Sequence, residues 1–107
     1  MAAVTDSSVY TEGRADRFLS YLESEWGGIA ALAEEWDEFD NLDKIVFDQE
    51  WVIRVDRLRD LRRWAEKGLL TPEQQARYQE LLKLIEQYRP TLERLLEEEE
   101  PAQRKAA

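Results

Sequence analysis

Residues 68–74, Gly-Leu-Leu-Thr-Pro-Glu-Gln, contain the strongest local signals in the chain. Thr71 suits the N-cap of a helix, Pro72 suits its first position, and Gln74 completes a capping box with Thr71. Gly68 suits the C′ position that ends a preceding helix in a Schellman motif. Two helices joined by so short a linker are expected to form an antiparallel hairpin.

The apolar residues on both sides of this turn recur at helical spacing. Before it, the pattern predicts a helix over about 49–67 with Asp48 as N-cap and a main stripe of Trp51, Val55, Leu58, Leu61 and Ala65. After it, a helix over about 72–98 carries the heptad seam Tyr78, Leu81, Ile85, Tyr88, Leu92 and Leu95. Pro90 lies inside this seam, whose phase continues, so we expect a kinked helix.

The N-terminal half contains a third apolar stripe at steps of three and four residues. Its members are Ala15, Phe18, Leu22, Trp26, Ile29, Ala33, Trp36 and Phe39. Because this phase survives Gly27-Gly28, we expect a bend or short break there, and the alternative is a full turn between two antiparallel helices. Residues 40–43 predict a turn, and residues 45–47 fit either one helical turn or a short extended piece.

These patterns predict an all-α fold, a three- or four-helix bundle built on a C-terminal antiparallel helical hairpin. We expect a flexible N-terminal tail over 1–12, a single helical domain over 13–98 and a disordered C-terminal tail over 99–107. A chain of 107 residues is long enough to form one core without disulfides or metal.

The residue types exclude several kinds of chemistry. The chain has no Cys and no His, which excludes zinc fingers, thiol nucleophiles and imidazole bases. We therefore expect no enzyme, no catalytic residues, no metal, no cofactor and no small-molecule substrate. No apolar run approaches the roughly 20 residues of a membrane span, and the N-terminus has no apolar signal region, so we expect a cytoplasmic protein without membrane contact.

Charge is distributed unevenly along the chain, whose formal net charge is −9. Residues 1–47 contain 11 acidic and 3 basic side chains, whereas residues 48–107 contain 13 acidic and 12 basic ones. Direct binding to nucleic acid is disfavoured, because phosphate recognition needs a cationic surface. The acidic cluster at 34–43 precedes a basic stretch at 54–67, so we expect it to face that stretch or a partner protein.

The predicted helix over 49–67 is apolar on two sides. Ile53 and Trp64 lie at about 200° and 220° from Trp51 on a helical wheel, away from the main stripe. We favour a central helix packed on both sides, and the alternative is a docking face. Since Trp and Arg are over-represented among interface hot spots, Ile53, Arg57 and Trp64 are candidate partner-binding residues.

These observations predict a non-enzymatic helical protein–protein interaction module or small subunit, bound to a protein partner or to itself. Self-association is expected through the heptad seam from Leu92 onward, which extends beyond what a hairpin partner over 49–67 can cover. The alternative function is an acidic inhibitor or antitoxin-like regulator that neutralises a basic protein partner. Its candidate contact residues are Glu34, Glu35, Asp37 and Glu38.

Overall fold

The computed structural model describes the backbone of residues 9–106 and the side chains of residues 9–97. Within that range every regular element is a helix, so the predicted all-α fold is confirmed. The elements are α1 (Glu12–Gly27), α2 (Ile29–Glu35), the 3-10 helix η2 (Trp36–Glu38), α3 (Asn41–Glu66) and α4 (Pro72–Ala106). Most of the predicted N-terminal tail, residues 1–8, lies outside the described residues, as does residue 107.

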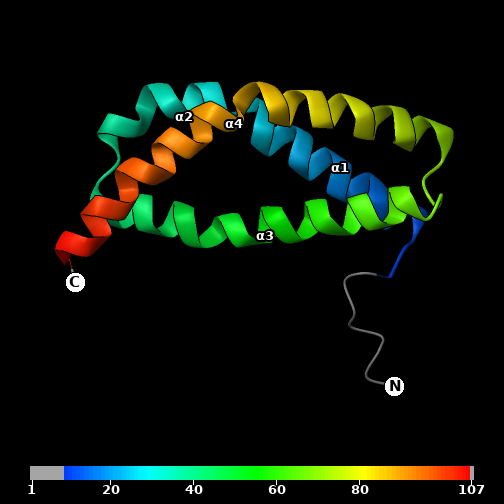
Figure 1. Ribbon diagram of the computed structural model, residues 1–107, viewed down its shortest axis with the longest axis horizontal. Helices are drawn as coiled ribbons and strands as arrows, with labels where there is room; N and C mark the ends of the chain where they lie inside the picture. The colour runs from blue at the N-terminus through cyan, green and yellow to red at the C-terminus, as the bar shows by residue number, and fades with distance from the viewer. Residues whose placement is uncertain (1–8, 107) are drawn as a thin grey trace, which may run out of the picture.

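Helix α3 runs along one side of the molecule, and α4, which is joined to it at one end, begins on the opposite side and slants across toward the start of α3 (Figure 1). Helix α1 passes between them and packs against both, while α2 packs against α4. The bundle is therefore built on the predicted C-terminal antiparallel hairpin, with the N-terminal helices filling the space that the hairpin leaves.

The turn between α3 and α4 has the geometry that its sequence predicts. Gly68 has a positive φ of 71°, which an L side chain rarely adopts, and its N–H donates to the Ala65 carbonyl at 3.1 Å. The N–H of Leu69 donates to the Trp64 carbonyl at 3.0 Å, which completes the Schellman motif. On the other side of the turn, Thr71 Oγ1 accepts a hydrogen bond from the Gln74 N–H, which is one half of the capping box that begins α4.

The break at the two glycines is short. Helix α1 ends at Gly27 and α2 begins at Ile29, while Gly28 keeps helical angles of φ −89° and ψ −2°. Trp26 and Ile29 are both buried, so the apolar stripe continues across the break. The predicted short break is confirmed; α2 leads away from α1 and does not fold back along it (Figure 1).

The N-cap of helix α3 is Asp40, eight residues before the predicted N-cap at Asp48. The carboxylate of Asp40 accepts a hydrogen bond from the Asp43 N–H at 2.8 Å and caps the helix there. The predicted turn over 40–43 is therefore a helix start, and Ile45–Phe47 are helical. Phe47 supports this longer helix because its ring contacts both Trp36 and Trp51, at centroid distances of 5.4 and 5.5 Å.

Helix α4 continues through Pro90 and bends along its length, as the predicted kink requires (Figure 1). Its backbone stays helical to Ala106, so the boundary predicted at residue 98 is not a break in the helix. Leu92 and Leu95 are buried within this one chain. The expectation that the seam from Leu92 onward is open to a second chain is therefore wrong, because α3 is longer than predicted and α2 also packs on α4.

The core forms where α1, α3 and α4 meet. Trp64 is 1% exposed, stacks on Phe18 at 5.3 Å and meets the edge of Tyr10 at 5.6 Å. The second apolar side of α3 is therefore covered by the start of α1 at this end, as expected for a central helix. Trp64 is consequently a core residue and is not available as part of a docking surface.

We expect Trp64→Ala to lower the free energy of unfolding by about 3–5 kcal/mol, because it removes a fully buried indole. Denaturant unfolding followed by circular dichroism measures this loss. Val52→Ala, at an exposed position of the same helix, is the matched control and should change stability by less than about 0.5 kcal/mol. Equal effects of the two substitutions would contradict the placement of Trp64 in the core.

Candidate interaction surface

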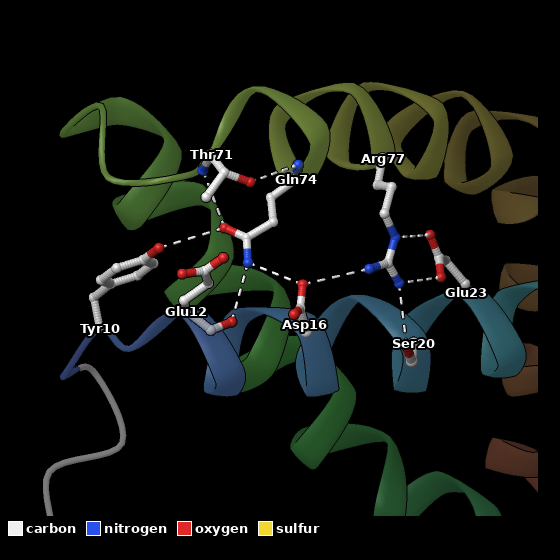
Figure 2. Close-up of polar contacts among 8 residues, drawn as sticks. All are labelled: Tyr10, Glu12, Asp16, Ser20, Glu23, Thr71, Gln74 and Arg77. Carbon is white, nitrogen blue, oxygen red and sulfur yellow. Dashed lines mark hydrogen bonds and ion pairs between the residues drawn. The ribbon is translucent and has the colours of Figure 1, made fainter.

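A buried amide joins the start of α4 to the start of α1 (Figure 2). Gln74 is 2% exposed, and its Oε1 accepts from the Thr71 N–H at 3.1 Å and from the Tyr10 hydroxyl at 3.4 Å. Its Nε2 donates to the Glu12 carbonyl at 3.0 Å and to Asp16 Oδ1 at 2.9 Å. Thr71 Oγ1 in turn accepts from the Gln74 N–H at 3.1 Å, which closes the capping box.

One helical turn further along α4, Arg77 forms a second link to α1 (Figure 2). Its Nε and Nη2 donate to the two carboxylate oxygens of Glu23 at 3.2 and 2.8 Å, and Nη2 also donates to Ser20 Oγ at 3.1 Å. The hydrogen bonds that Arg77 donates to Glu23 raise the pKa of Arg77, and the charges of Glu23 and Asp16 add to this increase, against the opposite effect of burial. Because these groups are paired with one another, the network fastens α1 to α4 and offers no free group to a ligand.

A small aromatic hollow lies beside Arg54, on the inner side of α3. Its volume is about 300 Å³, and Phe39, Phe47 and Trp51 are among the residues that line it. The Arg54 Nε donates to Glu25 at 2.6 Å, and the guanidinium carbon lies 5.0 Å from the centre of the Trp51 ring. Nη1 has no hydrogen-bond partner but is covered by protein atoms. Since Glu25 and Arg54 neutralise one another and Nη1 is covered, the two charged side chains of the hollow are already paired.

The four acidic candidates lie together near one end of the molecule. Glu34 and Glu35 end α2, Asp37 and Glu38 belong to η2, and all four are exposed. Among the described side chains, no ion pair joins them to the basic stretch at 54–67. Four arginines of that stretch, Arg54, Arg59, Arg62 and Arg63, pair within α3 or with Glu25, so the expected internal match between the two charged segments does not form.

The three candidates on α3 have different surroundings. Ile53 is exposed, Trp64 is buried, and the guanidinium of Arg57 lies over the Phe18 ring at 4.6 Å. The structure therefore does not bring them into a single patch. Arg57 covers the edge of the core, and only Ile53 presents an apolar side chain to solvent.

Ile53 is one of five exposed aliphatic residues on α3, a set that the sequence did not single out. Its members lie on the first two thirds of α3 and expose 40–67% of their surface: Leu42, Val46, Val52, Ile53 and Val55. We call these five residues the outer face of α3. Val55 was predicted to lie on the core stripe, and that prediction is wrong. Because the helix is capped at Asp40, it includes Leu42 and Val46, which lie on the same side as Ile53 at steps of four and seven residues. A helix predicted to start after Asp48 leaves Leu42 and Val46 out and so hides this pattern.

The described residues contain no group of three or more Asp or Glu side chains placed to hold a metal ion. In the same part of the chain, no helix combines the length and the apolar composition of a membrane span. Comparison of the chain with protein-family models, with curated proteins and with solved structures finds no match.

We expect Gln74→Ala to lower the free energy of unfolding by about 2–3 kcal/mol, because it removes four hydrogen bonds of a buried amide. Gln74→Glu keeps the acceptor but places a carboxylate against Asp16. Chemical denaturation of both variants measures the effect, with Gln79→Ala at an exposed position as control. Adding Asp16→Asn to Gln74→Glu should recover part of the loss, and a lack of recovery would contradict the contact.

We expect the folded protein to lose stability at alkaline pH because of Tyr78. Burial raises the pKa of its hydroxyl, Glu66 raises it further, and Arg62 lowers it. As the pH rises, Tyr78 therefore loses its proton first in the unfolded chain, near its ordinary pKa of 10.0, while the folded chain still keeps the proton. The stabilisation is complete below that pH and is lost as pH rises through the folded pKa. Denaturant unfolding at a series of pH values should show a flatter alkaline decline for Tyr78→Phe, and identical slopes would contradict this assignment.

Proposed function

We propose that this protein is a non-enzymatic interaction module that docks a protein partner on the outer face of α3. The observation that carries the proposal is that α3 exposes five aliphatic side chains along its first two thirds, of which Leu42, Val46 and Ile53 lie on one side, while other residues of the helix pack against α1 and α4. Single exposed aliphatic residues are normal on protein surfaces, whereas contiguous exposed patches are typical of binding sites.

Contact with a protein partner is energetically more favourable for these exposed aliphatic side chains than contact with water. Full burial of a Val, Leu or Ile side chain contributes about 1.5–3 kcal/mol relative to full exposure. Val52, Ile53 and Leu42 each keep roughly half or more of their surface exposed, so a partner helix gains a share of that energy from each. Helix α3 is held by the bundle before binding, which reduces the ordering cost of association.

A second candidate function, the acidic inhibitor, is supported by a different observation. Glu34, Glu35, Asp37 and Glu38 are exposed next to the start of α3 and form no ion pair among the described residues with the basic stretch. Such a cluster accelerates encounter with a basic partner, and its effect weakens as salt screens the charges. Binding through the outer face of α3 should persist at high salt, and this difference separates the two functions. The cytoplasmic location stays a prediction from the sequence.

A photoreactive residue at Val52, introduced into the full chain in its host cell, tests the proposed docking surface. The crosslinked protein is identified by mass and its affinity for the unlabelled chain is then measured. We expect Val52→Glu to weaken this affinity at least about tenfold without lowering Tm, because it places a charge in an apolar contact.

Two controls make the result decisive. Ala76→Glu introduces the same charge at an exposed position on α4 and should leave the affinity unchanged. Reversal of Glu34, Glu35, Asp37 and Glu38 to Lys tests the acidic inhibitor. If Val52→Glu leaves the affinity unchanged and this reversal abolishes it, the acidic inhibitor replaces the docking module as the proposed function.

A further inference from the structure

The aromatic hollow beside Arg54 lies where the N-terminal helices part from α3. Helix α1 packs against α3, but after the break at the two glycines α2 packs against α4. The hollow, of about 300 Å³, occurs at this divergence. Its lining comes from both sides, with Ile29 and Leu32 from α2 and Phe47 and Trp51 from α3.

Three aromatic rings of the lining are held in place by other parts of the core. Trp51 meets the buried Trp26 edge to face, with 5.2 Å between the ring centroids, and Phe47 meets the buried Trp36 in the same way at 5.4 Å. Phe39 also lies against Trp36, at 5.5 Å. Because these walls are fixed in the free protein, a molecule that binds between them has little ordering cost to offset.

The hollow has few groups that hold water. Five of its nine lining residues present aromatic or aliphatic side chains. Its two charged side chains, Arg54 and Glu25, are paired with one another, and the guanidinium also lies over the Trp51 ring. A well-ordered water needs about two to four polar partners, so an apolar molecule displaces the water of such a site favourably.

We propose that this hollow is a binding site for a small, neutral aromatic molecule. An engineered cavity of about 150 Å³ lined by Leu, Ile and Phe binds benzene, so a hollow of about twice that volume suits two fused rings. Aromatic walls favour an aromatic occupant, because stacked and edge-to-face ring pairs attract one another beyond the effect of the area that they bury.

The ion pair in the wall determines the charge of the occupant. Arg54 and Glu25 compensate one another, so a charged molecule would enter the hollow without a free counter-charge among its lining residues. Moving an unpaired charge out of water is costly, and a neutral molecule avoids that cost. The site is separate from the proposed docking surface, since Trp51 lies about 160° around α3 from Ile53.

Gly28 offers a way to close the hollow without disturbing the backbone. It lines the hollow and has helical angles, φ −89° and ψ −2°. The nearest atoms to a Cβ at this position are the carbonyl oxygens of Ser24 and Glu25, at 3.4 and 3.8 Å, which is ordinary contact. Gly27 is the matched control, because it also has room for a Cβ but is not among the residues that line the hollow.

Three probes with one two-ring skeleton test the site by NMR titration of the isotope-labelled full chain. They are 2-naphthol, its saturated analogue decahydro-2-naphthol, and the anion 2-naphthoate. We expect 2-naphthol to shift the Trp51 indole N–H signal to saturation and to leave that of Trp64, in the core beside the hairpin turn, unchanged. The saturated alcohol, which has no aromatic ring, and the charged naphthoate should bind at least about tenfold more weakly.

Substitutions at the hollow complete the test. Gly28→Leu should raise the Kd of 2-naphthol at least about tenfold with Tm maintained, whereas Gly27→Leu should change that Kd by less than about twofold. Ser24→Leu fills the hollow from α1 and provides the same test if Gly28→Leu does not fold. The proposal is overturned if 2-naphthol shows no saturable binding, if either analogue binds as tightly, or if the leucine substitutions at the hollow leave the Kd unchanged.

Discussion

The side-chain amide of Gln74 is the point at which three segments of the chain are held in place. Its oxygen closes the capping box that begins α4, and its nitrogen binds the carbonyl of Glu12 and the carboxylate of Asp16 in α1. A buried amide has two donors and two acceptor positions, and all four form hydrogen bonds with protein groups. The direction in which α1 leaves this corner is therefore set by the same residue that starts the last helix.

The position of α1 explains why one part of α3 is covered and another is exposed. The start of α1 brings Phe18 and Tyr10 onto Trp64, near the hairpin turn, and so covers the second apolar side of α3 there. Farther from the turn, α1 leads into α2, which packs on α4. Nothing in the described chain then covers Val52 and Ile53, so the outer face of α3 follows from the path of α1.

Local sequence signals predicted the parts of this fold that depend on neighbouring residues. The stop at Gly68, the capping box at Thr71 and the continuous helix through Pro90 are short-range features, and each has the predicted form. The start of α3 was mispredicted because Asp40 and Asp48 are equally good caps by local criteria. The contacts of Phe47 with Trp36 and Trp51 favour the longer helix, and Trp36 lies outside α3, in η2.

The candidate surface was predicted only in part, for a related reason. Ile53 was identified by its angle on the helical wheel, but that angle alone cannot tell whether a neighbour covers it. Trp64 has nearly the same angle and is buried, because the covering helix reaches only one end of α3. The partners of Gln74 in α1 could not be predicted either, since they lie 58 and 62 residues away in the chain and no local pattern connects them.

The charge distribution is not explained by the stability of the helices alone. At α3, Asp40 and Asp43 at the start and Arg63 near the end suit the helix dipole, and each such contact is worth about 0.3–1 kcal/mol. Glu34 and Glu35 have the opposite relation to α2, because they lie at its C-terminal end, where the dipole disfavours negative charge and no basic residue offsets it. Their repulsion also adds to that of Asp37 and Glu38. An arrangement that costs stability within the chain is understandable if the compensation comes from a cationic surface outside it.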